Sequence, residues 1–451
     1  MRWTLAATIL GSSIAFIDAS VVNVALPPIQ SDLGGGLAAQ QWVVDGYLLT
    51  LGSLILVGGS LGDIFGEVRL FVIGVAAFGL ASALCAVAPD ITTLIVFRGL
   101  QGVAGALLTP ASLAVITASF EGSERGAAIG TWTAWTGISF VIGPLVGGWL
   151  IDVSSWRVIF LINIPIAIAT IAMALLLIPK GSMGGKRVPV DYLGGALCVL
   201  GLGGVVYSLI EQPTLGWSHW SVAGGLAAGA ACLAGFVAWE MRAPSPMLPL
   251  RLFARRNFSV TNVETLAVYG GLSAWGFFLV LFLQQLAGFS PFRAGLATVP
   301  VTIVMFFLSS RAGRLSARHG PRLFMALGPL VAGASLAALA RMPTHVDYWV
   351  DLLLPLLGFA VGLSLTVAPL TTTVLADAGP GDAGIASGVN NAIARVAGLV
   401  AIAAVGIAAS GGGHKLTAHG FHVAMLIVAA LVGLGGVIGA VGIRNPELSA
   451  R

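Results

Sequence analysis

Residues 59–71 of this 451-residue chain read GSLGDIFGEVRLF, and residues 313–324 repeat the pattern as GRLSARHGPRLF. Both stretches contain Gly-x-Leu, a second glycine seven residues after the first, and then a basic residue followed by Leu-Phe. The second copy begins 254 residues after the first. One such match is weak evidence by itself, and a chain that contains the same fold twice would show others in the same order.

Two further matches have similar spacing. Pro110 in LLTPASL and Pro369 in TVAPLTT are 259 residues apart, and RGAAIG at 125–130 returns 258 residues later as AGIASG. Repeated halves around a central site are the architecture of many transporters, which rock one half against the other. The ordered matches therefore predict two homologous six-helix halves, residues 1–180 and 251–451, with two inserted helices within residues 181–250.

The composition indicates an all-α integral membrane protein. Hydrophobic residues make up 57% of the chain, charged residues only 9%, and the mean hydropathy is +0.97. A soluble domain carries about 25% charged residues, so most of this surface cannot face water. The net charge is +4, but the basic residues lie in short loops between apolar segments. That pattern is typical of membrane topology and not of a nucleic-acid-binding face, so the expected partner is the lipid bilayer.

A membrane-spanning helix needs about 20 mostly apolar residues. Breaks at glycine, proline and charge clusters predict fourteen such helices. They cover residues 4–28, 40–62, 68–88, 92–117, 126–150, 156–178, 191–211, 219–240, 257–286, 292–312, 321–341, 349–374, 383–408 and 419–443.

The distribution of basic residues predicts the orientation. An even number of spans places both termini on the same side of the membrane. With a cytoplasmic N-terminus, sixteen of the 22 lysines and arginines fall in cytoplasmic segments and two fall within helices. Cytoplasmic loops of membrane proteins are enriched in Lys and Arg, so we expect both termini inside the cell. The four in outer segments are Arg157, Arg293, Arg341 and Lys415.

Five charged residues lie inside predicted helices. Such residues usually face a cavity or pair with one another, and they are functional by default. Structural ion pairing is the open alternative, above all for Asp45 and for Arg395, whose Asn391 lies one turn earlier on the same face. The five are Asp18, Asp45, Arg98, Glu264 and Arg395.

Three of these five are acids and two are arginines, which leaves one acid without a full basic partner. An unpaired carboxyl group in a dry site can take up and release protons near neutrality. We therefore expect a proton-coupled transporter in which Asp18 exchanges the proton, Arg98 tunes it, and Glu264 serves as a second acid.

The fifth predicted helix contains GISFVIGPLVGGWL at residues 137–150. Pro144 removes a backbone hydrogen bond and bends the helix. Gly143, Gly147 and Gly148 allow a facing helix to approach closely. The motif predicts a bendable contact between the two halves, with ordinary small-residue helix packing as the alternative.

Asp63 stands at a helix end on the predicted cytoplasmic face. It is placed to accept backbone N–H groups where the thirteenth helix begins, near Asp382, as anions do at the positive end of a helix. A solvated loop acid is the alternative interpretation.

These motifs together resemble the fourteen-spanner drug:proton antiporter branch of the major facilitator superfamily. GSLGDIFG resembles its loop signature, RGLQGVAGALLTP (98–110) its fourth-helix Arg-x-x-Gln-Gly motif, and GISFVIGPLVGGWL its fifth-helix motif. IDASVVNVALPPI, SSWRVIFLINIPI, APSPMLPLRLF and SGVNNAIARVAG are similar to further stretches of that branch. The resemblance covers nearly the whole chain. It implies that the Arg98 motif faces the central cavity and that Asp63 stabilises the outward-facing state.

The loop signature departs from the family pattern. The conformational residues carried over to it are Gly59, Asp63, Gly66 and Arg69. The family usually has basic residues just after the aspartate and after the second glycine, where this chain has Ile64 and Glu67. In the second copy Ala317 takes the place of the acid.

The resulting expectation is a monomeric exporter in the cell membrane that exchanges small hydrophobic or cationic compounds for protons. Export of an endogenous metabolite, antibiotic or lipid is the alternative. An enzyme is disfavoured because the six histidines fall in or beside loops without metal-ligand spacing. The three cysteines lie in apolar runs, and no phosphate-binding Gly-x-x-x-x-Gly-Lys loop occurs. We therefore expect no metal and no cofactor.

Overall fold

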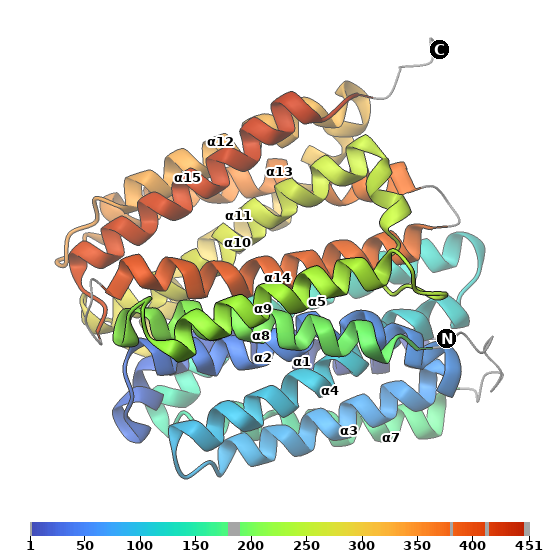
Figure 1. The fold of residues 1–451 in the computed structure, drawn as a ribbon, viewed down its shortest axis with the longest axis horizontal. Helices are drawn as coiled ribbons and strands as arrows, with labels where there is room; N and C mark the ends of the chain where they lie inside the picture. Colours follow the sequence, from blue (N-terminus) through green and yellow to red (C-terminus); the bar gives the residue numbers. More distant parts are fainter. Residues whose placement is uncertain (1, 179–189, 379–381, 411–414, 446–451) are drawn as a thin grey trace. The chain divides into compact units, whose positions relative to one another are not determined.

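The structure is a computed structural model that describes residues 2–178, 190–378, 382–410 and 415–445. In these ranges it contains helices and no strand. Fourteen of its helical segments are long and apolar enough to cross a membrane, which confirms the predicted count and fold class. Figure 1 traces the chain from α1 to α15. The helices are α1 (Arg2–Leu33), α2 (Leu37–Phe65), α3 (Glu67–Ala86), α4 (Ile91–Ser119), α5 (Gly122–Val153), α6 (Val158–Leu161), α7 (Asn163–Leu177), α8 (Tyr192–Leu215), α9 (Trp220–Glu240), η1 (Leu250–Ala254), α10 (Arg256–Gln285), α11 (Pro291–His319), α12 (Pro321–Leu339), η2 (Tyr348–Leu353), α13 (Leu354–Ala378), α14 (Ala383–Ser410) and α15 (Ala418–Gly442).

Several predicted helices differ from the observed ones; for example, the predicted helix 292–312 continues to His319 as α11. The first predicted helix does not end at Pro27-Pro28, because α1 continues through both prolines to Leu33. The predicted helix 156–178 is broken into α6 and α7 around Ile162. The predicted helix 349–374 begins as the π-helix η2 before α13 continues it. Prolines and breaks in a helix leave backbone N–H and C=O groups without their usual partners, and neighbouring helices in a membrane bundle can satisfy these groups. Glycine, proline and charge clusters are therefore weak signals of a helix end in this chain.

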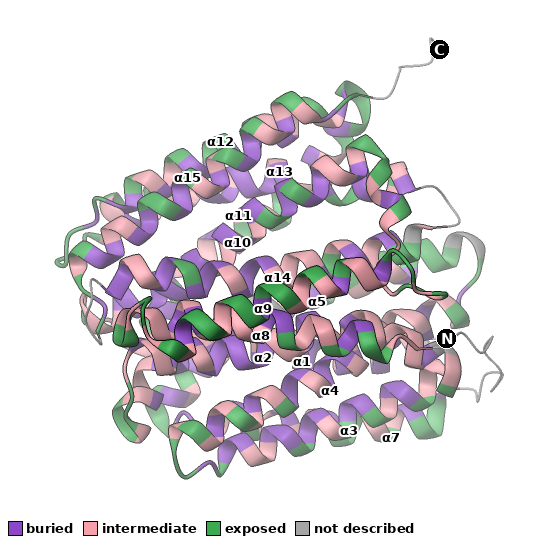
Figure 2. Ribbon diagram, viewed as in Figure 1, coloured by how far each residue is buried: buried purple, intermediate pink, exposed green. Residues whose placement is uncertain are grey.

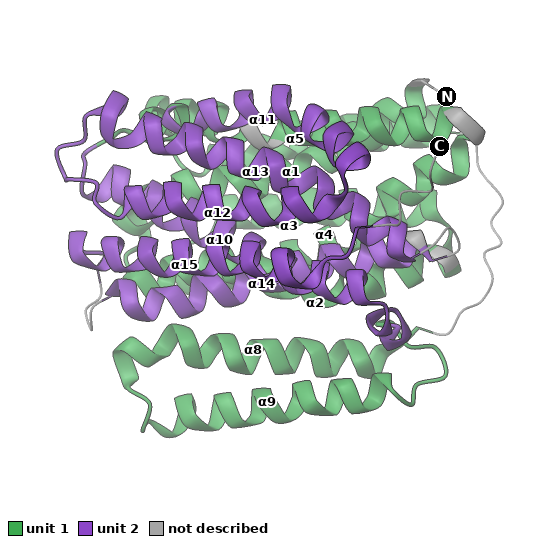
Figure 3. Ribbon diagram, turned by 90° about the horizontal axis from the view of Figure 1, so that it is seen from above, with its two compact units in different colours: residues 1–248, 289–296 green, residues 249–288, 297–451 purple. Residues whose placement is uncertain are grey.

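The chain divides into two compact units, coloured in Figure 3. One comprises Met1–Leu248 and Phe289–Leu296, and the other comprises Pro249–Gly288 and Ala297–Arg451. In the first unit α1 packs on α5 and α7, and α3 packs on α4 and α7. In the second unit α10 packs on α14 and α15, and α12 packs on α13 and α15. These matching pairings are what two copies of one six-helix fold would show.

The second glycine of the repeated loop signature has the same backbone geometry in both copies. Gly66 joins α2 to α3 with φ 88°, and Gly320 joins α11 to α12 with φ 87°. A side chain at such a positive φ is strained, so glycine is the residue that allows the tight turn. The repeated sequence pattern is therefore explained by a repeated turn.

The inserted pair α8–α9 belongs to the first unit and packs on α2. Its two helices cross closely at glycines, since a Cβ on Gly229 would lie 2.7 Å from the backbone nitrogen of Val205. Trp42 of α2 donates from Nε1 to Glu211 of α8 at 3.0 Å. Most residues of α10 are buried, whereas most residues of α9 are exposed or of intermediate burial (Figure 2).

Candidate functional site

The centre of the first unit contains a buried ion pair. Arg98 Nη1 on α4 donates to Asp18 Oδ2 on α1 at 2.5 Å, and neither side chain is more than 1% exposed. Arg98 also donates from Nε to the carbonyl of Val43 at 3.1 Å. Its guanidinium carbon lies 4.4 Å from the ring centroid of Tyr47. Among the described residues, the recorded hydrogen-bond acceptors of Arg98 lie on α1, α2 and α4.

Gln101 connects this pair to its surroundings. It lies three residues after Arg98, and residues at that spacing share one face of a helix. Gln101 Oε1 accepts from Arg98 Nη1 at 2.5 Å, while its Nε2 donates to Asp18 Oδ1 at 2.9 Å and to Ser82 Oγ at 2.8 Å. The Arg-x-x-Gln spacing of the fourth-helix motif therefore places two side chains on the same carboxylate.

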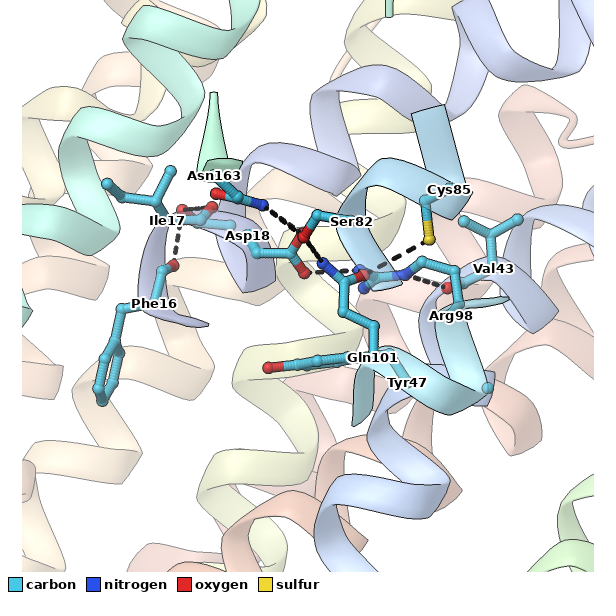
Figure 4. A network of polar contacts seen from close by, with 12 residues as sticks. Phe16, Ile17, Asp18, Val43, Tyr47, Ser82, Cys85, Arg98, Gln101 and Asn163 are labelled. Atoms are coloured by element: carbon cyan, nitrogen blue, oxygen red, sulfur yellow. Dashed lines mark hydrogen bonds and ion pairs between the residues drawn. The ribbon is translucent and has the colours of Figure 1, made fainter. Parts of the chain in front are cut away.

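Asn163 completes the network from the first turn of α7. Its Nδ2 lies 3.2 Å from Ser82 Oγ and 3.5 Å from Asp18 Oδ1. Figure 4 shows these side chains pointing toward one another. Sequence reasoning missed Ser82 and Asn163 as site residues. Asn163 lies in SSWRVIFLINIPI, one of the stretches that resemble the antiporter branch, and could have been identified there. Ser82 lies in no motif that would have pointed to it.

The start of α4 is set by Asp90. Its Oδ1 accepts from the backbone N–H of Thr93 at 2.9 Å, and its Oδ2 accepts from the hydroxyl of Thr93 at 2.8 Å. These bonds hold the pKa of Asp90 below its usual range. Such an N-cap fixes the first turn of the helix that carries Arg98 and Gln101.

Asp18 is therefore not the acid that lacks a basic partner. Its two carboxylate oxygens contact Arg98, Gln101 and Asn163. Of the three helix acids, Asp45 and Glu264 are the ones whose carboxyl oxygens have no hydrogen-bond partner among the described residues. Both are fully buried.

Glu264 of α10 is packed inside the second unit. A Cβ on Gly439 of α15 would lie 2.9 Å from Glu264 Oε2, so a glycine makes room for the carboxyl group. One turn earlier on α10, Thr261 Oγ1 is also buried without a described partner. Glu264 thus lies against α15, and Thr261 precedes it by three residues, on the same side of α10.

The helix α14 carries the predicted pair Arg395 and Asn391, and the structure records a further polar contact beside it. Asn391 is exposed and Arg395 is half-buried. Asn390, one residue away, donates to Asn262 Oδ1 at 3.1 Å and to Thr265 Oγ1 at 2.8 Å. The sequence analysis missed Asn390 because the choice between two adjacent asparagines depends on how α14 is rotated against α10.

The glycines of the fifth-helix motif do not all contact the same helix: Gly143 and Gly147 lie against α1, and Gly148 lies against the start of α11. A Cβ on Gly143 would lie 3.0 Å from the carbonyl of Ile17, and one on Gly147 would meet Val21, so both allow α5 to pack on α1 of the same half. The expected role of these two glycines in a contact between halves stays a prediction.

Gly148 and Pro144 meet the segment Phe289–Leu296, which groups with the first unit. A Cβ on Gly148 would lie 2.7 Å from Phe292 Cα, and a Cβ on Gly295 would lie 2.5 Å from the carbonyl oxygen of Pro144. Pro144 thus lies where α5 meets the start of α11.

The loop signature is described only in part. The side chain of Asp63 lies outside the described part of the structure, so its predicted contact near Asp382 stays a prediction. Asp382 itself accepts from Arg251 at 2.7 Å. A Cβ on Gly59 would lie 3.9 Å from Pro110 Cβ. Arg69 lies in the first turn of α3.

A second pair of carboxyl groups, missed in the sequence, stands at one end of α8 and α9. Asp191 Oδ1 accepts from Trp239 Nε1 and from the backbone of Gly194, both at 2.8 Å. Glu240 Oε2 accepts from the backbone of Leu248 at 2.9 Å. The bond between Asp191 and Trp239 joins the start of α8 to the end of α9. Within the described ranges no three His, Cys, Asp or Glu side chains are grouped to hold a metal ion.

Comparisons with known proteins agree with this architecture. The family profile described as the Major Facilitator Superfamily matches residues 8–402. The chain is 36% identical over 422 residues to the probable actinorhodin transporter of Streptomyces coelicolor, covering 90% of this chain and 72% of that protein. It is 33% identical over 445 residues to the methylenomycin A resistance protein of the same species, covering 97% and 91%. It is 34% identical over 419 residues to a puromycin resistance protein of Streptomyces alboniger, covering 91% and 82%.

Solved structures show the same fold at low identity. A peptide transporter in complex with sulfate superposes with a TM-score of 0.72 at 15% identity, covering 97% of this chain and 93% of that chain. A D-xylose-proton symporter superposes with a TM-score of 0.69 at 13% identity, covering 98% of both chains.

Proposed function

Because the chain belongs to the major facilitator superfamily, we propose that it exports small hydrophobic or cationic compounds, such as antibiotics, in exchange for protons. Three relatives that it matches over most of their length are named for actinorhodin transport, methylenomycin A resistance and puromycin resistance. The observation that carries the proposal is the set of buried ionisable groups in its membrane helices, since such groups are costly in a bilayer and mark substrate or proton pathways.

The proton carrier in this proposal is Glu264, with Asp45 as a second acid. Protonating Asp18 removes the negative charge that Arg98 faces at 2.5 Å. Protonating Glu264 or Asp45 breaks no described hydrogen bond, because neither carboxyl group has one. A group that gains and loses a proton in each cycle without dismantling a network is better suited to exchange. Asp18 and Arg98 then position α1 against α4.

The test measures uptake of a fluorescent cationic dye and of antibiotics into everted membrane vesicles with an imposed pH gradient. Glu264→Gln should abolish gradient-driven uptake while dye binding persists. Glu240→Gln is the matched control, since it neutralises another buried glutamate at the end of the inserted pair. Asp18→Asn should slow uptake without uncoupling it. If Asp18→Asn uncouples transport and Glu264→Gln couples normally, the proton carrier is Asp18 and the proposal for Glu264 is wrong.

The second candidate is export of a metabolite that the cell itself makes. One relative is named as a tetracenomycin C resistance and export protein of Streptomyces glaucescens, so resistance and export of one compound coincide in that relative. Competition of the dye by culture extract from the source cell, and not by the antibiotic panel, would favour this candidate.

The protein is a multi-pass membrane protein. We place it in the cell membrane with both termini cytoplasmic, on the strength of the basic-residue distribution. We further propose that one chain is the transporting unit and that nucleic acid plays no part. Size-exclusion chromatography with light scattering tests the oligomeric state.

A further inference from the structure

An open groove lies between α12 and the η2–α13 segment of the second unit. Its volume is about 520 Å³. Its α12 side is formed by Val331, Ala334 and Ala338, which are exposed and spaced at three and four residues on one helix face. Leu354 at the start of α13 supplies an exposed apolar wall opposite. The groove is thus mostly apolar and accessible from the surface of the unit.

The irregular segment η2 forms one edge of the groove. Six residues, Tyr348–Leu353, form a π-helix in place of an α-helical turn, and such segments occur frequently at functional sites. Asp347 holds the segment by accepting from the backbone of Trp349 at 2.9 Å. The backbone of Asp347 in turn donates to Asp351 Oδ2 at 2.9 Å. The edge is therefore fixed by its own hydrogen bonds.

Two opposite charges line the same groove without pairing. Arg341 and Asp351 both contribute to its lining. Among the described residues, the structure records no ion pair for either side chain and no side-chain hydrogen bond for the guanidinium of Arg341. A bound molecule that carries both a negative and a positive group would satisfy both residues.

The charges lie where a membrane span ends. The apolar helix α12 ends at Leu339, two residues before Arg341, and η2 begins the next apolar span. Trp349, in η2, is 71% exposed, and tryptophan is enriched at the level of lipid head groups. The apolar part of the groove therefore faces the depth of acyl chains and its charged part faces the depth of head groups.

From this arrangement we propose that the groove binds a phospholipid whose head group carries a primary amine. The phosphate pairs with Arg341, the ammonium group donates to Asp351, and an acyl chain covers the apolar wall of α12. A choline head group has no N–H to donate to the carboxylate. A head group with only negative charge satisfies Arg341 and is repelled by Asp351.

Native mass spectrometry of the detergent-purified full chain tests the proposal. The protein is titrated with phosphatidylethanolamine, phosphatidylcholine and phosphatidylglycerol of identical acyl chains, and the bound fraction is measured for each. Wild-type protein should retain phosphatidylethanolamine most tightly. Arg341→Ala should weaken its binding about tenfold, the size expected for one hydrogen bond to a charged group. Arg293→Ala is the matched control, because Arg293 is also exposed and lies outside the groove.

Two further variants separate charge from shape. Asp351→Asn keeps an oxygen that can accept from the Asp347 backbone, so it should remove the preference for ethanolamine over choline without unfolding η2. Ala338→Trp fills the groove with its charges intact and should reduce retention of all three lipids. Equal binding of the three lipids to wild-type protein, or equal loss in Arg293→Ala and Arg341→Ala, would overturn the proposal. Displacement of the lipid by a transported dye would overturn it as well, because the groove would then be a substrate path.

Discussion

Replacing Arg98 by methionine should destabilise the protein strongly and in a pH-dependent way. The change keeps a long apolar side chain but leaves Asp18 buried with only neutral donors, Gln101 at 2.9 Å and Asn163 at 3.5 Å. Breaking a buried ion pair by removing one partner costs about 3–5 kcal/mol. The corresponding change Asp18→Asn should cost less, because Arg98 keeps the carbonyl of Val43 as an acceptor at 3.1 Å.

The cost of Arg98→Met has a ceiling set by protonation of the stranded carboxyl group. An aspartate with an ordinary pKa of about 3.9 can be protonated at pH 7 for about 4 kcal/mol and at pH 5 for about 1.5 kcal/mol. The loss of stability should therefore shrink as pH falls. With an unfolding entropy of about 2.1 cal/mol/K per residue, 4 kcal/mol corresponds to a fall in Tm of about 4 °C for a chain of this length.

The assay is thermal unfolding in detergent at a fixed scan rate, at pH 7 and pH 5, for both single variants and for the double variant. Asp18→Asn combined with Arg98→Met carries no stranded charge, so it should recover most of the stability lost in Arg98→Met. A loss that is the same at both pH values, or a double variant no more stable than Arg98→Met, would refute the idea that the pair is ionised and mutually dependent.

Three further changes test the architecture. Pro144→Ala should leave the protein in the membrane but change its leak or exchange rate, measured with dye in proteoliposomes; failure to accumulate would make the motif purely structural. Gly229→Leu should separate α8 from α9 and cost about 1–3 kcal/mol by overpacking, seen as a lower Tm, whereas an unchanged Tm would contradict the close crossing. Ser449→Cys, in a chain lacking its native cysteines, should react with an impermeant maleimide only from the cytoplasmic side; labelling from outside alone would reverse the proposed topology.

Hydropathy and spacing along the chain were enough to predict the fold class. Each spanning helix satisfies its own backbone hydrogen bonds, so a run of about 20 apolar residues predicts a span without knowledge of its neighbours. The same locality explains why Arg98 and Gln101 were recognisable as a unit, since they lie on one face of one helix. It also explains why Gly66 and Gly320 could be recognised as matching positions, because the positive φ of each is required by a local turn.

Which groups meet was decided by tertiary packing. Asp18 meets Asn163 across 145 residues of sequence, and Ser82 joins them from a third helix. Such contacts depend on how each helix is rotated about its axis. Composition and periodicity specify that rotation poorly here, because apolar residues surround these helices on every side. The charge count in the sequence indicated only that one of three acids lacks a full basic partner. Packing showed that Asp18 pairs with Arg98 and that Glu264 and Asp45 have no recorded basic partner among the described residues.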